Sequence, residues 1–202
     1  QIGGKLRQAL AESVHTRPRF SVGVTDAVPK LISFRLLESV LKPPLKLRLE
    51  CIEGEFEHLL GELALNRLDL VVADRSAPQR ANLKLDSHLL SNVGISLFGS
   101  ADLHDRYGKD FPRNLDGAPL LLPARSDPLR NAIDLWLEAH DIRPEIVGEF
   151  SDSALLKTFG RAGLGLFPAP ATMQADILAQ FQAQPLGALQ GVSESWYAIS
   201  TH

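Results

Sequence analysis

The sequence is poor in the residues that most often indicate a metal centre, a disulfide or a membrane span. It has 202 residues and one cysteine, Cys51, which excludes an internal disulfide and a zinc site built from cysteines. No stretch approaches the roughly 18 consecutive apolar residues that a membrane-spanning helix needs. The net charge of -3 gives no general attraction for nucleic acid. With 45% hydrophobic, 22% charged and only 6% aromatic residues, the composition predicts a soluble globular protein.

Methionine and cysteine each occur only once, and each supports a further expectation. Met173 is the only methionine, so a chain that begins at Gln1 has no initiator, and we expect either a fragment of a longer protein or a processed mature protein. Cys51 alternates with Leu47 and Leu49 in a strand-like run. This alternation favours a buried core thiol over a redox sensor.

Hydrophobic periodicity predicts alternating strands and helices in the first third of the chain. Short apolar runs or strict alternation indicate strands, and apolar residues that recur every three or four positions indicate helices. The pair Pro43 and Pro44 ends the first helix. In chain order we expect a strand at 20–24, a helix at 28–40, a strand at 47–52, a helix at 56–63 and a strand at 68–73.

The second half repeats this order after two strand-like patches, at 83–90 and 93–98, and a polar loop at 102–106. Strands that alternate with helices favour parallel sheets with right-handed crossovers, so the predicted fold class is α/β. We expect two similar Rossmann-like lobes with a hinge and an interdomain cleft. The remaining elements are a strand at 119–122, a helix at 129–137, a strand at 145–150, a helix at 155–159, a strand at 164–167, a helix at 172–181 and a strand at 196–200.

These elements divide the chain into three expected parts. Residues 1–19 are mostly polar and close at Pro18, which indicates the end of a linker helix followed by a linker. The first lobe is predicted to comprise 20–97 together with 196–202. The second lobe is predicted to comprise 98–195.

The motifs that resemble enzyme signatures fail on order or spacing. Gly160, Gly163 and Gly165 follow a helix and precede a strand, the reverse of the dinucleotide-binding fingerprint. The run from Gly94 to Gly99 has one residue too many for a nucleophile elbow and is typical of a strand throughout. The six histidines are scattered singly, without the spacing that places two imidazoles on one helix face. We therefore expect no enzymatic activity, no metal ion and no cofactor.

The loops that follow the strands are the candidate binding region. Ligands in open α/β sheets bind beyond the carboxyl ends of the strands, although Asp26, Ser151 and Asp152 are also good helix N-caps. Unpaired N–H groups at helix starts, with Arg125 beside them, favour a small anion, whereas the carboxylates favour a hard cation, so the sign of the ligand stays open. The predicted effector-binding residues are Thr25, Asp26, Glu53, Arg125, Ser151 and Asp152.

Three segments carry a resemblance to a known family. They are a strand leading to a Thr-Asp helix start at 22–26, a helix end followed by a strand at 66–72, and a glycine-containing strand at 163–168. Their order and spacing resemble the effector-binding domain of LysR-type transcriptional regulators, which has a fold like that of type II periplasmic binding proteins. Within that family, the segments 22–27 and 148–157 are most similar to an activator of a bacterial sodium/proton antiporter gene.

The resemblance implies the effector-sensing and dimerisation domain of a cytoplasmic DNA-binding regulator. A winged helix-turn-helix would precede Gln1, so promoter DNA would be bound by a domain that is absent from this chain, and RNA polymerase would be a further partner. The resemblance also implies a small-molecule or ion effector in the cleft, no membrane partner, and a homodimer or homotetramer. In the dimer, the helix at 28–41 would pack against the helix at 153–162 of a second subunit.

A periplasmic solute-binding protein of an uptake system is the alternative. It has the same two-lobed fold, and it also lacks an initiator methionine once its signal peptide is removed. The regulator-like loops and the basic lead-in before Phe20 argue against it. A two-lobed transferase or dehydratase would need a catalytic constellation that the sequence does not contain.

Overall fold

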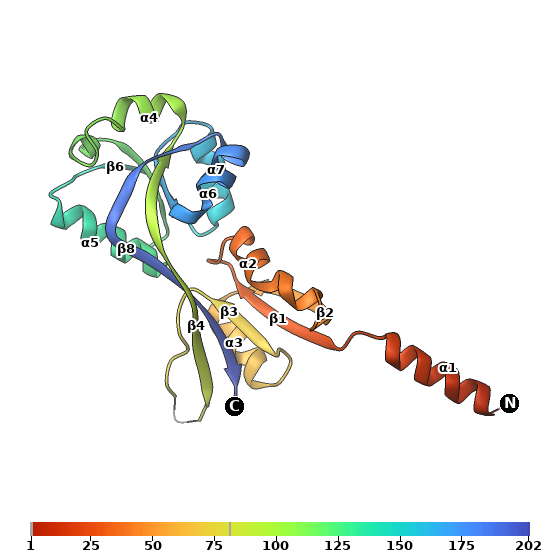
Figure 1. Cartoon of the computed structure of the whole chain (residues 1–202). Helices are drawn as coiled ribbons and strands as arrows, with labels where there is room; N and C mark the ends of the chain where they lie inside the picture. Colours follow the sequence, from red (N-terminus) through yellow and green to blue (C-terminus); the bar gives the residue numbers. More distant parts are fainter. Residues whose placement is uncertain (1, 81) are drawn as a thin grey trace.

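The computed structural model describes residues 2–80 and 82–202 (Figure 1). Two lobes lie at opposite ends of a pair of long strands, and helix α1 (Ile2–His15) extends away from both lobes. The predicted α/β class is confirmed. None of the helices in the described part of the chain is long and apolar enough to cross a membrane.

Lobe I, the lobe that contains strands β1, β2 and β3, forms around three parallel strands. β1 pairs with β2 on one side and with β3 on the other, so the predicted β-α-β-α-β order is confirmed. Val22, Val24 and Val71 are buried, as expected for parallel strands that helices cover. The elements are β1 (Arg19–Thr25), α2 (Lys30–Leu37), the 3-10 helix η1 (Glu38–Leu41), β2 (Arg48–Gly54), α3 (Phe56–Ala64) and β3 (Leu70–Ala73).

Two long antiparallel strands, β4 (Leu85–Gly99) and β8 (Gln184–Thr201), connect the lobes (Figure 1). The predicted patches at 83–90 and 93–98 are therefore parts of one continuous strand. The predicted strand at 196–200 is only the end of β8, because the earlier half of β8 is rich in glycine and polar residues and is stabilised by pairing with β4. The pairing shifts register at three places, between Leu89 and Ser91, between Gly94 and Ser96, and between Leu97 and Phe98.

The main sheet is mixed rather than purely parallel. Its strand order is β2-β1-β3-β8-β4-β7, and the pairs β3–β8, β8–β4 and β4–β7 are antiparallel. The expectation of parallel sheets is therefore confirmed for β1, β2 and β3 and for β5 and β6, and it is wrong for the pairs formed by β4, β7 and β8. The reason is that β4 and β8 pair directly with each other, which antiparallel strands can do without a helical crossover.

Lobe II, the lobe that contains β5 and β6, differs from the prediction in two places. The polar loop expected at 102–106 is a helix, because Leu103 turns inward while the polar residues around it face water. The strand expected at 164–167 begins only at Phe167, and Leu166 forms a single parallel bridge with Leu120. The elements are α4 (Ala101–Tyr107), η2 (Arg113–Leu115), β5 (Pro119–Pro123), α5 (Pro128–Ala139), β6 (Glu145–Phe150), α6 (Ser153–Arg161), β7 (Phe167–Pro170), η3 (Ala171–Met173) and α7 (Gln174–Phe181).

Each lobe has its own apolar core, and a third cluster joins them. Leu59 belongs to the core of lobe I, and Ile133 belongs to the core of lobe II. The joining cluster contains Val22 from lobe I, Phe167 from lobe II and Trp196 from β8, and all three are fully buried. The position of one lobe is therefore coupled to the other by apolar packing along the connecting strands.

Cys51 is exposed, so the expectation of a buried core thiol is wrong. It lies on β2, which is the edge strand of the main sheet and has only β1 as a neighbour. Leu49 on the same strand is partly buried against the joining cluster, but this cluster does not extend to Cys51. An alternating pattern on an edge strand does not by itself ensure that both ends of its apolar face are covered.

Candidate ligand-binding cleft

The loops that follow the parallel strands of both lobes line one cleft of about 1050 Å³. In lobe I these loops follow β1, β2 and β3, and in lobe II they follow β5 and β6. The carboxyl ends of these strands therefore meet at the cleft, as expected for ligand sites in open α/β sheets.

Five of the six predicted site residues line this cleft, and they come from both lobes. Arg125 does not line it, because its side chain is 83% exposed and extends toward Glu149 on β6, with 3.8 Å between Nε and Oε1. The residues that the structure brings together are Thr25, Asp26, Glu53, Ser151 and Asp152. Their role in binding stays a prediction.

Thr25 stands out among these residues because its hydroxyl is buried without a partner. The residue is 4% exposed, and its Oγ1 atom has no hydrogen bond. A buried polar atom that lacks a hydrogen bond costs about 1–3 kcal/mol. The end of β1 therefore places an unsatisfied hydroxyl beside the cleft, just beneath its surface.

Asp152 has a structural role at the start of α6. Its Oδ1 atom accepts hydrogen bonds from the N–H groups of Ala154 at 2.8 Å and Leu155 at 3.4 Å, which makes it the helix N-cap. Asp26 and Glu53 are exposed, and no described residue donates such a bond to their carboxylates. Of these three acids, Asp152 is therefore the one that acts as a helix N-cap in the described part of the chain.

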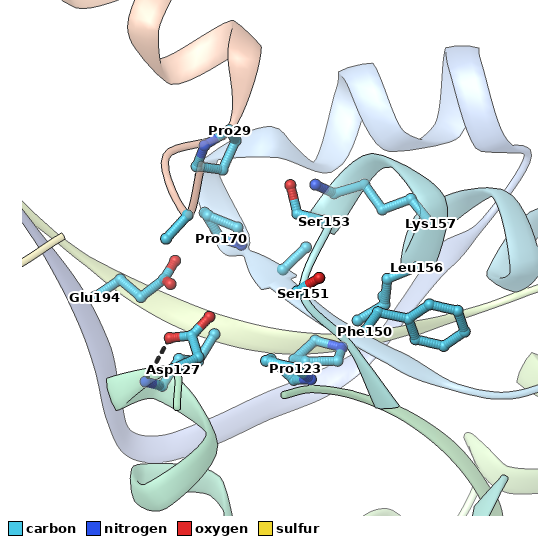
Figure 2. Close-up of a pocket in the computed structure, with 14 residues that line it drawn as sticks. Pro29, Pro123, Asp127, Phe150, Ser151, Ser153, Leu156, Lys157, Pro170 and Glu194 are labelled. Atoms are coloured by element: carbon cyan, nitrogen blue, oxygen red, sulfur yellow. Dashed lines mark hydrogen bonds between the residues drawn. The ribbon is translucent and has the colours of Figure 1, made fainter. Parts of the chain in front are cut away.

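Three charged residues that the prediction did not include surround the inner end of the cleft, where a smaller pocket lies (Figure 2). Lys157 on α6 is 6% exposed, and its side chain forms no hydrogen bond or ion pair with any described residue. Figure 2 shows Lys157 and Ser153 on one side of this pocket and Glu194 and Asp127 on the other. The inner pocket therefore has a basic wall and an acidic wall.

Burial disfavours the charged forms of all three residues. It lowers the pKa of Lys157, although Glu194 and Asp152 act in the opposite direction. Burial raises the pKa of Glu194 to about 8, and the carboxylates of Asp127 and Asp74 add to the rise. Burial likewise raises the pKa of Asp127. The charges of the pocket are thus poorly solvated and not balanced by direct ion pairs.

A helical pattern in the sequence could have identified Lys157. Ser153, Leu156, Lys157 and Gly160 are spaced as one face of a helix, and the last three are buried. Lysine on an otherwise inward face is unusual and indicates a special environment. For Glu194 the sequence offers no comparable signal, because its strand has no clear alternation.

A buried arginine holds the lobe II loops in place. Arg130 on α5 is 3% exposed and donates to the Pro123 carbonyl at 2.9 Å, to Asp134 at 2.9 Å and to Glu149 at 3.0 Å. These bonds connect the end of β5, helix α5 and the end of β6. Since the loops after β5 and β6 line the cleft, this network fixes one of its walls.

The cleft does not present a metal centre in the part of the chain that the structure describes. No group of three or more histidine, cysteine, aspartate or glutamate residues is placed there to hold a metal ion. The polar groups that converge on the cleft are instead single carboxylates, hydroxyls and one buried amine, an arrangement typical of a pocket for a small molecule.

The fold and the cleft define a two-lobed ligand-binding domain of the kind found in bacterial regulators. The chain belongs to the family of LysR substrate-binding domains, whose family model matches residues 14–202. Its relatives are transcriptional regulators and not enzymes. The alternatives of a solute-binding protein and of a transferase or dehydratase are therefore set aside.

Among proteins of known role, the chain is similar to the transcriptional activator protein NhaR of Escherichia coli strain K12 and of Shigella flexneri. It is 29% identical to each over 180 residues, which cover 89% of this chain and 59% of the relative. The chain thus spans about three-fifths of the length of these relatives.

Solved regulatory domains share the fold. The apo regulatory domain of HypT from Salmonella typhimurium aligns with a TM-score of 0.69 at 16% identity, over 93% of this chain and 88% of that one. The reduced form of the regulatory domain of OxyR2 from Vibrio vulnificus aligns with a TM-score of 0.68 at 15% identity, over 92% of this chain and 87% of that one. The BenM effector-binding domain with its effector benzoate aligns with a TM-score of 0.68 at 16% identity, over 93% of this chain and 85% of that one.

Proposed function

We propose that this chain is the effector-sensing and dimerisation domain of a LysR-type regulator that activates a sodium/proton antiporter gene in response to sodium or pH. The similarity to NhaR over most of the chain supports the type of regulator. We further propose that it works in the cytoplasm, joined to an N-terminal winged helix-turn-helix that binds promoter DNA, with RNA polymerase as a further contact. The lobe boundaries predicted from the sequence belong to the same proposal.

The observation that carries the proposal is the charge of the cleft. Seven acidic residues line it, against three basic ones. A cleft with an excess of one charge attracts ions of the opposite charge and concentrates them. The acidic residues are Asp26, Glu53, Glu55, Glu57, Asp74, Asp127 and Asp152, and the basic ones are Lys30, Arg75 and Lys157.

A ligand or ion in the cleft would act by stabilising one arrangement of the lobes over another. The lining residues come from both lobes, so an occupant contacts both walls at once. Binding that is tighter in the closed arrangement shifts the population toward closure. The lobes would transmit this change to the DNA-binding domain through the linker that precedes β1.

An ion titration tests the sodium response. We would add sodium, lithium or potassium chloride at constant ionic strength and follow the backbone amide shifts of the isotope-labelled chain. A saturable change at Asp26 and Asp152 that is specific for sodium or lithium supports the proposal. Equal small changes with all three salts contradict a direct response to sodium, and a pH titration under the same conditions then tests the response to protons.

The proposed dimer rests on apolar side chains that two neighbouring helices expose. Phe34 on α2 is 61% exposed, and Leu155 and Phe159 on α6 are 49% and 39% exposed. An ion pair of 3.2 Å between Arg35 on α2 and Asp176 on α7 holds α2 near α7, which in turn contacts α6. The helices α2 and α6 that carry these apolar residues are therefore near neighbours through α7, and α2 of one subunit would pack against α6 of a second copy.

A further inference from the structure

We propose that the inner pocket of the cleft binds a small zwitterion, with its cationic group between Asp127 and Glu194 and its anionic group at Lys157 beside the start of α6. The inference rests on the proposed effector-sensing role, and it adds an organic ligand to the signal by sodium or pH. A molecule of the chemical class of glycine or alanine has the required charges.

The pocket is small and has an apolar floor. Its volume of about 40 Å³ leaves room for roughly three water molecules, at about 10–15 Å³ each. Residues without charge, among them Pro29, Phe150, Leu156 and Pro170, form much of its lining. The pocket opens into the large cleft, since Asp127, Ser151 and Lys157 line both. A compact molecule with few heavy atoms therefore fits, and its side chain can extend into the cleft.

The anionic end of the ligand is indicated by Lys157. The amine lies in a residue that is only 6% exposed, and no described side chain or carbonyl accepts a hydrogen bond from it. Figure 2 shows it directed toward the pocket and ending beside Ser153, with Ser151 also on this part of the wall. A ligand carboxylate at this point would meet the amine of Lys157, and the positive end of the α6 helix dipole also favours negative charge there, although Asp152 already accepts from the N–H groups of Ala154 and Leu155.

The cationic end is indicated by the opposite wall. Asp127 already accepts a hydrogen bond of 2.9 Å from the N–H of Leu129, but its carboxylate also faces Glu194. The side chain of Glu194 forms no hydrogen bond or ion pair with any described residue. An ammonium group between the two carboxyl groups would stabilise the ionised forms of both, which burial and their proximity disfavour in the free protein.

Simpler ligands satisfy only one wall. A lone metal cation would be attracted by Asp127 and Glu194 but repelled by the amine of Lys157. A lone carboxylate would be attracted by Lys157 but repelled by the acids. Only a molecule that carries both charges balances both walls, because opposite charges a few ångströms apart interact strongly in a site with little water.

The protonation state of Glu194 predicts how ligand binding depends on pH. Burial raises the pKa of this residue to about 8, with contributions from Asp127 on the loop before α5 and Asp74 after β3, while Lys157 on α6 acts in the opposite direction. At pH 7 the carboxyl is therefore mostly protonated in the free protein. A bound ammonium group favours the ionised form, so binding at pH 7 releases a proton, and affinity increases as the pH rises toward 8.

Isothermal titration calorimetry with the whole chain tests the proposal. Glycine and L-alanine are titrated at pH 7 in two buffers with different ionisation enthalpies, with acetate and methylammonium as single-charge probes. We expect saturable binding of the zwitterions, with each single-charge probe at least about tenfold weaker, and a buffer-dependent heat that reports proton release. Absence of saturable zwitterion binding, or equal binding of acetate or methylammonium, overturns the proposal.

Three variants assign the binding to the pocket. Lys157→Met and Glu194→Gln remove one wall each, and Lys109→Met, which removes an exposed lysine outside the cleft, is the matched control. We expect glycine affinity to fall at least about tenfold in the first two variants and to stay unchanged in the control. Equal losses in all three overturn the proposal. If Lys157→Met does not fold by circular dichroism, the comparison of Glu194→Gln with the control decides.

The sodium titration separates this proposal from the proposed function. A sodium-specific shift without zwitterion binding leaves the ion response intact and overturns the zwitterion site. Zwitterion binding without a sodium-specific shift supports the site and contradicts the ion response. If neither occurs and the amides of the cleft do not respond to pH, both proposals fail.

Discussion

The two walls of the cleft hold their polar side chains in different ways. Lobe I provides mostly exposed carboxylates, such as Asp26 and Glu53, which accept no hydrogen bond from any described residue, although the Asp74 side chain is buried and paired with Arg75. Lobe II provides groups that are fixed by the rest of the lobe, such as Asp152, which caps α6, and the loops that Arg130 holds. A rigid wall sets the geometry of a ligand, whereas a wall of free side chains adapts to it and adds charge. The lobe II wall is therefore where ligand specificity is expected to reside.

The largest expected effect is on stability, from breaking the rigid wall. Arg130→Met removes a buried guanidinium with three acceptors, and we expect the free energy of unfolding to fall by about 2–3 kcal/mol, since Asp134 and Glu149 are partly exposed and keep some solvation. Urea denaturation followed by circular dichroism measures it. The control Arg67→Met in lobe I, which removes a 66% exposed side chain paired with Glu62, should cost about 0–0.5 kcal/mol. Equal losses would show that the two lobes do not differ in this way.

The second expected effect is on association, where both lobes contribute one helix. Leu155→Asp places a charge in the proposed dimer contact of α6, and we expect the dissociation constant to rise about thirtyfold or more. Sedimentation equilibrium measures this constant. Leu65→Asp, which changes a 63% exposed leucine just after α3, is the control and should leave the constant unchanged. A monomeric parent chain at tens of micromolar, or equal association of the two variants, contradicts the proposed dimer.

A smaller effect distinguishes the carboxylates of the two walls. Asp152→Ala removes the N-cap of α6 and is expected to lower the free energy of unfolding by about 1 kcal/mol. Asp26→Ala removes an exposed carboxylate without such a bond and should leave stability nearly unchanged. Thermal and urea unfolding of both variants provide the comparison. A similar loss in Asp26→Ala would mean that this acid also has a structural role.

The smallest effect concerns Thr25, whose buried hydroxyl on the lobe I wall has no hydrogen bond with any described residue. Thr25→Val replaces an unpartnered hydroxyl by a methyl group of similar shape, and we expect a gain in stability of about 0.5–1 kcal/mol. Thr158→Val is the control, because its hydroxyl donates to the Ala154 carbonyl at 2.9 Å and its loss should bring no gain. A loss of stability in Thr25→Val, measured by urea unfolding, would show that the hydroxyl already has a stabilising role in the free protein.

The sequence predicted the parts of the fold that depend on local apolar pattern. The strands and helices of lobe I, and β5, α5, β6 and α6 of lobe II, follow from such patterns, and so does the position of the loops at the cleft. The early half of β8 and helix α4 were missed, because strand pairing and one buried leucine stabilise them rather than a continuous periodicity. The lobe boundaries at 97–98 and 195–196 stay a prediction.

The predicted site was limited for a similar reason. Thr25, Asp26 and Glu53 could be placed because they lie at the carboxyl ends of strands that meet at one edge. Lys157 and Glu194 reach the pocket from the middle of a helix and of a long strand, so only the arrangement of the two lobes brings them together. Arg125 follows a strand as well, but it extends to the surface.

The paired strands that join the lobes restrict the kind of movement that the domain can make. β4 and β8 are linked by backbone hydrogen bonds along both lobes, so one lobe cannot slide past the other without breaking many of them at once. The register shifts near Ser91, Ser96 and Phe98 are points where the strand pair can bend and twist while the bonds on either side persist. When a ligand draws the two walls together, the strand pair would therefore twist. This twist would rotate the far ends of the two lobes relative to each other.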